Sequence, residues 1–167
     1  MHIKLLNVLF SFLFSLAPNT RAYGFKRNCL RLRGFTIAKN VRIVSSVKFH
    51  IPAISIGENK FIGHETMFVG GDAKIKIGKN VDIAPRLLIA TGSHNIGSTL
   101  QRAGEGHSSD VSIGDGTWIG ANCTILGGVN IGRGYIIAAG SLVKESCPDN
   151  CLIAGVPGSI KKLLDIG

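Results

Sequence analysis

The sequence lacks the short motifs that identify many enzymes and metalloproteins. Its 167 residues contain no glycine-rich phosphate loop after a strand, no GxSxG and no HExxH. Its four cysteines, Cys29, Cys123, Cys147 and Cys151, have neither zinc-site spacing nor the pattern of a disulfide framework. We therefore expect reduced thiols, no metal site and a cytoplasmic protein.

Acidic residues are missing from the first 57 positions. Residues 1–50 hold nine of the 19 Lys and Arg, and the first acidic residue is Glu58, so the net charge of +9 is concentrated near the N-terminus. A basic segment can bind nucleic acid. No recognised nucleic-acid motif or series of stacking aromatic residues accompanies it, so we expect no nucleic-acid partner.

A long hydrophobic run is also missing. The apolar segment 5–17 is too short to cross a bilayer as a helix, and no convincing cleavage site follows it. Polar residues recur along it at spacings of three and four, which predicts a helix with one thin polar stripe: Lys4, Asn7, Ser11 and Ser15. Three alternatives stay open. The helix docks on the protein or on a neighbouring subunit, or residues 1–33 contact an anionic membrane surface, or the segment is a cleaved signal.

Isoleucine recurs at a spacing of six, which is neither the helical period nor the strand period. It stands at 113, 119, 125, 131 and 137 in IGDGTWIGANCTILGGVNIGRGYIIAAGSL. This period is typical of a parallel β-helix, in which three hexads close one coil and each leading aliphatic residue points inward. The second hexad position is mostly small, and the fifth suits a half-buried strand site. Earlier hexads begin at Ile37, Ile43, Phe49, Ile56, Ile62, Phe68, Ile77, Ile83 and Ile89.

The hexads predict an all-β fold, a β-helix of about five coils over residues 37–148. Irregularities near 55 and at 70–72 shift the register, and the repeat stops after His94 to resume at 111–113. We divide the chain into a helical lead-in (1–36), a β-helix domain (37–156) with an excursion loop at 95–110, and a short C-terminal helix (157–167).

Histidine is the residue type best suited to catalysis here. His94 ends the hexad IATGSH where the repeat breaks into the long loop. Loops on a rigid scaffold concentrate functional residues, and a neutral imidazole can abstract a proton near neutral pH. His107, inside the loop, and His64 are weaker candidates. The three lack the paired short spacing of the zinc site in carbonic anhydrases built on the same solenoid.

The chain resembles the hexapeptide-repeat O-acetyltransferases, the group of galactoside, maltose and nodulation-factor acetyltransferases, and those of exopolysaccharide clusters. The resemblance rests on His94 with its loop, then VSIGDGTWIGANCTILGGVNIG, IIAAGSLVKE and IAGVPGSIKKL. It covers residues 77–162 well and 37–76 loosely. It implies a left-handed β-helix that assembles as a homotrimer, with active sites between subunits.

The resemblance also implies site residues. His94 matches the general base of the family. Asp72 matches an acidic residue of the acceptor site, and His64 stands where the family has an asparagine. Trp118 matches an aromatic residue beside the cofactor channel, and we place it with the substrate-binding residues. Ala121 replaces a frequent serine, so only its backbone N–H and that of Gly120 remain to hold an oxyanion.

Acetyl-CoA is the co-substrate that the resemblance implies. Ala139, Gly140 and Ser141 match the coil whose backbone receives the pantetheine arm. Gly155 and Pro157 match the turn near the adenine. Lys144, where many members have threonine, and Lys161 or Lys162 could reach the phosphates. Ser159 stands where an arginine is common.

The function that follows is acetyl transfer from acetyl-CoA to a hydroxyl group of a saccharide. The apolar helix and the basic segment favour a surface-polysaccharide precursor at the inner face of the cytoplasmic membrane. Within the enzymes, an amino-sugar N-acetyltransferase or a xenobiotic acetyltransferase is the alternative. A non-catalytic β-helix scaffold module is the alternative of another class.

Overall fold

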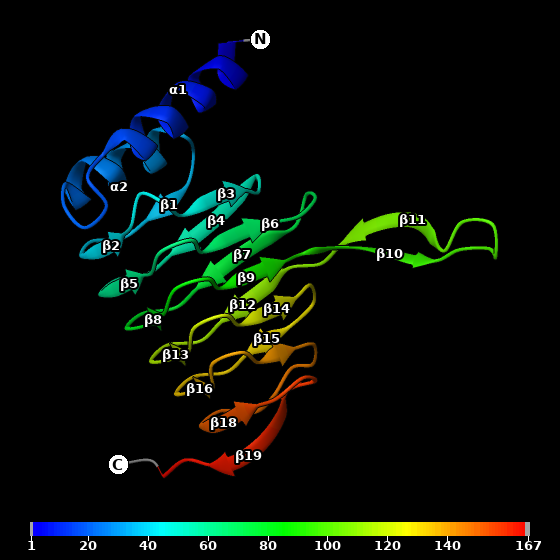
Figure 1. The fold of residues 1–167 in the computed structure, drawn as a ribbon. Coiled ribbons are helices and arrows are strands. Elements are labelled where there is room, and N and C mark those ends of the chain that lie inside the picture. The colour runs from blue at the N-terminus through cyan, green and yellow to red at the C-terminus, as the bar shows by residue number, and fades with distance from the viewer. Residues whose placement is uncertain (1, 166–167) are drawn as a thin grey trace.

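The computed structural model describes residues 2–165, and the side chains of residues 8–165. Two helices, α1 (His2–Leu16) and α2 (Tyr23–Leu32), lie at one end of a prism of stacked strands (Figure 1). The prism has three faces, which we call A, B and C, and each face is a sheet in which strands of successive coils pair in parallel. The chain passes through the faces in that order in each coil. This arrangement confirms the predicted parallel β-helix.

Each face is a sheet whose strands come from successive coils. Face A consists of β1 (Thr36–Ile37), β4 (Ala53–Ile56), β7 (Lys74–Ile77), β12 (Val111–Ile113) and β15 (Asn130–Ile131). Face B consists of β2 (Val41–Ile43), β5 (Lys60–Ile62), β8 (Asp82–Ile83), β13 (Trp118–Ile119), β16 (Ile136–Ile137), β18 (Cys151–Ala154) and β19 (Ser159–Leu163). Face C consists of β3 (Lys48–His50), β6 (Met67–Val69), β9 (Leu88–Ala90), β14 (Thr124–Leu126) and β17 (Leu142–Val143).

The core is the interior of the prism. Every leading residue of the predicted hexads is buried, which confirms the period of six. The fifth positions were expected to be half-buried, but they are buried too: Thr117, Cys123, Val129, Tyr135 and Ser141. The reason is the strand period, because residues two apart on a strand point to the same side, so each hexad sends both its fifth residue and the next leading residue inward.

Aromatic residues close the core at its N-terminal end. Phe49 lies 5.9 Å from Phe14 of α1, 5.5 Å from Phe35 and 5.3 Å from Phe68 between ring centroids. These contacts extend the solenoid core to the helical lead-in, so α1 and α2 seal the first coil, whose end would otherwise be open to water.

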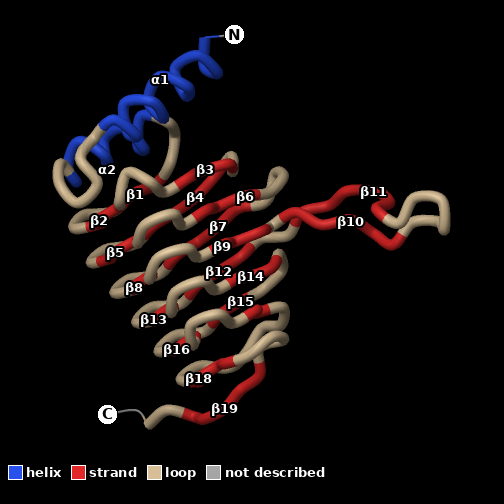
Figure 2. Tube along the Cα trace, viewed as in Figure 1, coloured by secondary structure: helices blue, strands red, loops and turns tan. Residues whose placement is uncertain are grey.

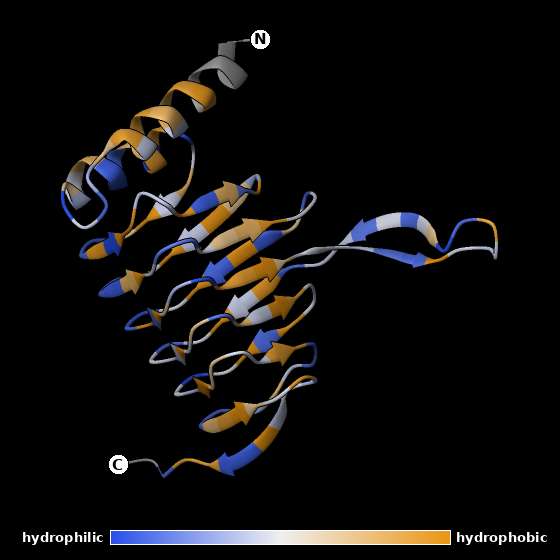
Figure 3. Ribbon diagram, viewed as in Figure 1, coloured by the Kyte–Doolittle hydropathy of each residue, from blue (hydrophilic) through white to orange (hydrophobic). Residues whose placement is uncertain are grey.

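The exposed side of α1 is apolar. Val8, Leu9, Phe12 and Leu16 are exposed, whereas Phe14 is buried against the prism. Ser11 and Ser15, part of the predicted polar stripe, line a groove with residues of β3; Ser11 is half-buried and Ser15 is exposed. Figure 3 shows the hydrophobic character of this helix. Within residues 2–165, no helix is long and apolar enough to cross a membrane.

Two segments differ from the sequence-based expectation (Figure 2). The predicted C-terminal helix is wrong, because residues 159–163 form β19, which pairs antiparallel with β18. The solenoid would otherwise end in a strand with unpaired backbone groups, and β19 satisfies them. The excursion at 95–110 is not an irregular loop but a hairpin of β10 (Gly92–Ile96) and β11 (Ala103–Ser108).

Candidate active site

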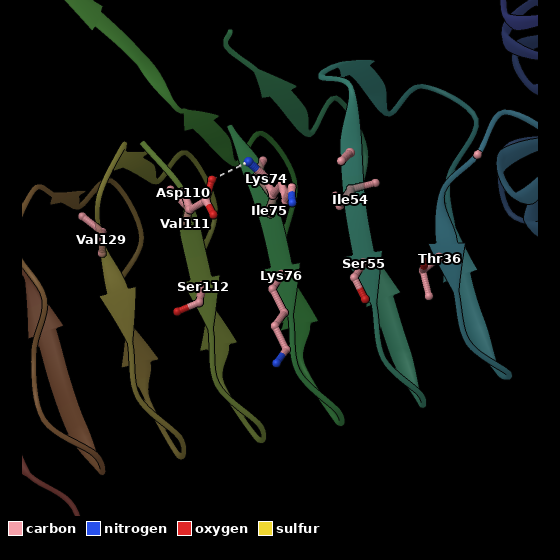
Figure 4. A pocket seen from close by; sticks show the side chains of 12 residues that line it. Thr36, Ile54, Ser55, Lys74, Ile75, Lys76, Asp110, Val111, Ser112 and Val129 are labelled. Atoms are coloured by element: carbon pink, nitrogen blue, oxygen red, sulfur yellow. Dashed lines mark hydrogen bonds between the residues drawn. The ribbon is translucent and has the colours of Figure 1, made fainter. Parts of the chain in front are cut away.

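The hairpin that carries His94 projects from the edge where face C turns into face A, here called the C–A edge (Figure 1). It interrupts the chain between β9 and β12. Hydrogen bonds tie its base to the prism. The Ser109 N–H donates to the Thr91 carbonyl at 3.0 Å, and the Lys74 N–H donates to Asp110 Oδ1 at 2.7 Å (Figure 4). The hairpin therefore leaves a fixed point of the scaffold.

A depression of about 650 Å³ lies where the hairpin meets the prism. It brings together three residues that the sequence pointed to, namely His94 on β10, His107 on β11 and Asp72 in the turn between β6 and β7. Ser93 and Ser108 also line it, together with Val69, Gly70, Gly71, Gly92 and Gly106. Asp72 and His94 are separated by a full coil in the sequence, yet they share this edge.

Glycine makes room at this site. Gly106 pairs with His94 across the hairpin, and a Cβ on Gly106 would lie 3.7 Å from the His94 ring. A Cβ on Gly70 would collide with the side chain of Thr91. Ser93, Ser108 and these glycines were not predicted as site residues. The only sequence signal for this group is that its glycines lie outside the second hexad position, where the repeat does not require them.

The polar groups of this depression are open to a ligand. The side chains of His94, His107 and Asp72 are exposed and make no hydrogen bond within residues 8–165. A general base usually has its second ring nitrogen held by an acceptor that fixes the tautomer. The described part of one chain does not supply that acceptor for His94, and Asp72 is left free to accept hydroxyl donors.

A second group of expected residues lies on a different edge, where face B turns into face C (the B–C edge). Successive turns of this edge stack on each other, because the Arg86 N–H donates to the His64 carbonyl at 2.8 Å and the Gly140 N–H donates to the Ala121 carbonyl at 2.8 Å. His64 Nδ1 also lies 3.4 Å from Ser46 Oγ. Ala139 is exposed on this edge, next to Gly140.

The remaining residues of the predicted cofactor site are spread along the prism. The Ser141 side chain is buried and donates to the Ala138 carbonyl at 2.6 Å, so only its backbone could meet a ligand. Lys144 follows β17 on the C–A edge and pairs with Glu145 at 2.9 Å. The turn that holds Gly155 and Pro157 lies beside Leu142, since the Leu142 N–H donates to the Gly155 carbonyl at 3.0 Å.

The predicted lysines and tryptophan lie on face B. Lys161 and Lys162 are exposed on β19. Trp118 is exposed on β13 and lines a depression separate from that of His94. The structure thus brings His94, Asp72 and His107 together, and it separates them within one chain from Trp118 and from the B–C edge.

Face A contains another depression, of about 460 Å³, which Figure 4 shows from close by. Its outward side chains include Thr36, Ser55, Lys74, Lys76 and Ser112. None of the residues predicted from the sequence lines it. Among residues 8–165, no cluster of three or more His, Cys, Asp or Glu side chains could hold a metal ion.

Comparison with known proteins places this architecture among transferases. Residues 110–145 match the family described as "Bacterial transferase hexapeptide (six repeats)". The chain is 35% identical to the galactoside O-acetyltransferase of Escherichia coli K12 over 123 residues, which is 73% of this chain and 60% of that protein. It spans between 45% and 60% of the length of such curated relatives.

Solved structures extend the likeness to nearly the whole chain. A maltose O-acetyltransferase from Clostridium difficile 630 is 30% identical, with a TM-score of 0.81 over 96% of this chain and 85% of that one. A galactoside acetyltransferase in complex with coenzyme A is 26% identical, with a TM-score of 0.82 over 98% of this chain and 82% of that one. The chain therefore belongs to the hexapeptide-repeat acetyltransferase family, and its fold is the left-handed parallel β-helix of that family.

Proposed function

We propose that the protein is an acetyl-CoA-dependent O-acetyltransferase that acts on a hydroxyl group of a saccharide, with His94 as general base. The observation that carries this proposal is the depression at the C–A edge. It places an imidazole and the Asp72 carboxylate around open space, with neither group engaged in a hydrogen bond within residues 8–165. A carboxylate that accepts hydroxyl donors suits a sugar, and an imidazole suits removal of a hydroxyl proton.

The reaction follows from these groups. His94 accepts the proton of the acceptor hydroxyl, and the hydroxyl oxygen attacks the thioester carbonyl carbon of acetyl-CoA. The tetrahedral intermediate expels the CoA sulfur, which takes the proton back from His94. An N–H donor must stabilise the oxyanion. Of the two expected donors, the Gly120 N–H already donates to the Ile137 carbonyl at 2.8 Å, whereas the Ala121 N–H has no partner within residues 2–165.

A second copy of the chain is needed to complete this site. His94 and Asp72 lie on the C–A edge, whereas Ala121, Ala139 and Gly140 lie on the B–C edge. One rigid prism cannot bring two of its edges together. We therefore propose a homotrimer in which the C–A edge of one subunit meets cofactor-binding residues of its neighbour, and in which the neighbour also supplies the acceptor that orients His94.

For acetyl-CoA, the backbone of Ala139, Gly140 and Ser141 would receive the pantetheine arm. The turn of Gly155 and Pro157 would lie at the adenine. Lys144, Lys161 and Lys162 are exposed and carry the positive charge that CoA phosphates require. The coenzyme A bound in the related galactoside acetyltransferase supports this choice of co-substrate.

The acceptor that we favour is a surface-polysaccharide precursor at the inner face of the cytoplasmic membrane. The exposed apolar residues of α1 and the basic segment around α2 support a peripheral contact with anionic lipid. Such a contact would hold the enzyme near lipid-linked acceptors.

The proposed function is tested by following release of the CoA thiol from acetyl-CoA with a panel of acceptors. The panel holds neutral mono- and oligosaccharides, amino sugars and chloramphenicol. We expect turnover with hydroxyl acceptors, and ester-linked acetate in the product. Amide-linked acetate on amino sugars would replace this proposal with an N-acetyltransferase. Failure to bind CoA in calorimetry would favour a non-catalytic scaffold.

A further inference from the structure

Face B carries an outward row of side chains that differs from the rows on the other two faces. Strand pairing puts Arg42, Phe61, Asp82 and Trp118 in register on β2, β5, β8 and β13. The corresponding row of face A is polar: Thr36, Ser55, Lys76, Ser112 and Asn130. The row of face C is mostly aliphatic: Lys48, Met67, Leu88, Thr124 and Leu142.

The row encloses a depression of about 390 Å³, lined by Arg42, Phe61, Asp82, Ile83, Ala84 and Trp118. Trp118 is 57% exposed. The Arg42 guanidinium carbon lies 5.5 Å from the centroid of the Phe61 ring. Within residues 8–165, neither the Arg42 guanidinium nor the Asp82 carboxylate makes a hydrogen bond. Both polar groups are therefore available to a ligand.

These groups match the chemistry of a sugar. A pyranose ring presents C–H groups on one face, which pack on an aromatic ring, and hydroxyl groups at its rim. The Asp82 carboxylate accepts hydrogen bonds from hydroxyl groups, and the Arg42 guanidinium donates to their oxygen atoms. One positive and one negative side chain leave these four residues without net charge, which suits a neutral polyol better than a phosphate.

A second copy of this chain fits face B less well than face C. Cores of stable interfaces are depleted of charged residues. The face B row contains two opposite charges that make no hydrogen bond within residues 8–165, whereas the face C row is nearly uncharged. The row on face B is therefore better suited to a ligand than to another subunit.

We infer that Arg42, Phe61, Asp82 and Trp118 form a binding platform for a chain of sugar residues. This inference rests on the proposed saccharide acceptor and specifies its length. Phe61 and Trp118 are two strands apart, which is roughly 10 Å along the prism. A single pyranose ring does not cover both aromatic rings, but two or more linked sugar residues do. The enzyme therefore binds oligosaccharides more tightly than monosaccharides.

The single tryptophan of the chain makes a direct test possible, because its fluorescence reports on Trp118 alone. The full-length protein is titrated without acetyl-CoA, using galactose, glucose, and galacto- and malto-oligosaccharides of two to six residues, and separately using CoA. We expect the emission to change with oligosaccharides, with a Kd that falls about tenfold between one and three residues. A change with CoA but with no oligosaccharide would overturn the inference.

Variants distinguish this platform from the reaction itself. Phe61→Ala and Asp82→Asn should raise Kd for oligosaccharides about five- to tenfold, and Phe61→Tyr should restore binding because it keeps the ring. Lys76→Ala on face A is the matched control and should leave Kd unchanged. Oligosaccharide binding without acetyl transfer would contradict the proposed function but support the platform. Acetyl transfer with equal Kd values in all variants would contradict the platform but support the proposed function.

Discussion

Lys60 is a charged residue inside one of the inward columns of the prism. It pairs with Val41 on β2, is 1% exposed, and its Nζ has no hydrogen-bond partner within residues 8–165. Burial lowers the pKa of Lys60 to about 8, although the nearby Asp115 and Asp82 carboxylates oppose this effect. An ammonium group without a partner is costly in such a place, so Lys60 destabilises the fold at neutral pH.

We expect Lys60→Met to stabilise the protein at pH 7 by roughly 3 kcal/mol, because each unit between the unfolded and the folded pKa corresponds to about 1.4 kcal/mol. The unfolded chain binds a proton at Lys60 up to about pH 10.4, whereas the folded chain loses it near pH 8. Wild-type stability should therefore rise with pH between these values. Urea melts of both proteins at pH 7 and pH 10 measure this, and the difference between the proteins should shrink at pH 10. Lys26 titrates in the same range but is present in both proteins, so its contribution cancels.

His94 is exposed on a hairpin and contributes little to the core. His94→Ala should therefore leave the melting temperature nearly unchanged while it lowers kcat by on the order of 100-fold, the usual contribution of general acid–base catalysis. Thiol release from acetyl-CoA measures the loss. His107→Ala is the matched control, because it lies in the same depression. If His107→Ala loses turnover and His94→Ala keeps it, the assignment of the base is wrong.

At the scale of the element, the fold is most sensitive to a change in the length of a hexad. Inward residues alternate with outward residues on every short strand, and a shift of one position turns a strand over. At the edges, coils approach so closely that glycine is required. A Cβ on Gly114 would lie 2.3 Å from the Gly132 carbonyl oxygen.

Deleting Asn122 from the turn between β13 and β14 should turn the following inward residues outward, among them Ile125, Ile131 and Ile137. Each lost burial costs about 1.5–3 kcal/mol, so a few of them exceed the stability of an ordinary domain. Thermal melts monitored by circular dichroism test this. Deleting Thr99 from the exposed hairpin tip is the control and should leave the melt unchanged. A cooperative melt near the wild-type temperature after deletion of Asn122 would contradict the hexad as folding unit.

At the scale of the whole molecule, the prism keeps its helical end, its hairpin and its C-terminal strand apart in space. The helices close one end, β19 closes the other, and the hairpin projects from the middle (Figure 1). The exposed apolar residues of α1 therefore lie at the end of the molecule, apart from the hairpin. A flat surface such as a membrane could contact this end without covering the prism faces.

Replacing Phe12 and Leu16 with serine should weaken binding to vesicles that contain anionic phospholipid, because both side chains are exposed. The melting temperature should hardly change, since the buried Phe14 stays in place. Co-sedimentation at low and high salt measures binding, which should fall with salt because Arg21 and Arg27 act through screened charge. Leu100→Ser, a change at an exposed residue of the hairpin tip, is a control for general loss of surface hydrophobicity. Full-length protein that ignores such vesicles at all salt concentrations would exclude the membrane contact.

The sequence by itself determined the coil, the inward columns and the break at His94. A hexad is a local unit, and its leading residue must be buried wherever the unit occurs. The helix expected at 157–167, outside the hexads, was wrong, because Ser159–Leu163 pairs as a strand with the otherwise unpaired edge of β18. Lys60 holds the fifth position of the hexad that begins at Ile56, and it is fully buried although fifth positions were expected to be half-buried.

Only the tertiary structure decided which residues share an edge of the prism. Asp72 and His94 meet at the C–A edge, whereas His64 joins Ala121 at the B–C edge. An edge depends on how many residues each preceding coil contains, and the irregular turn at 70–72 and the hairpin make those numbers unequal. The platform on face B arises in the same way, because Arg42, Phe61, Asp82 and Trp118 come from four coils and are aligned only by backbone hydrogen bonds between strands.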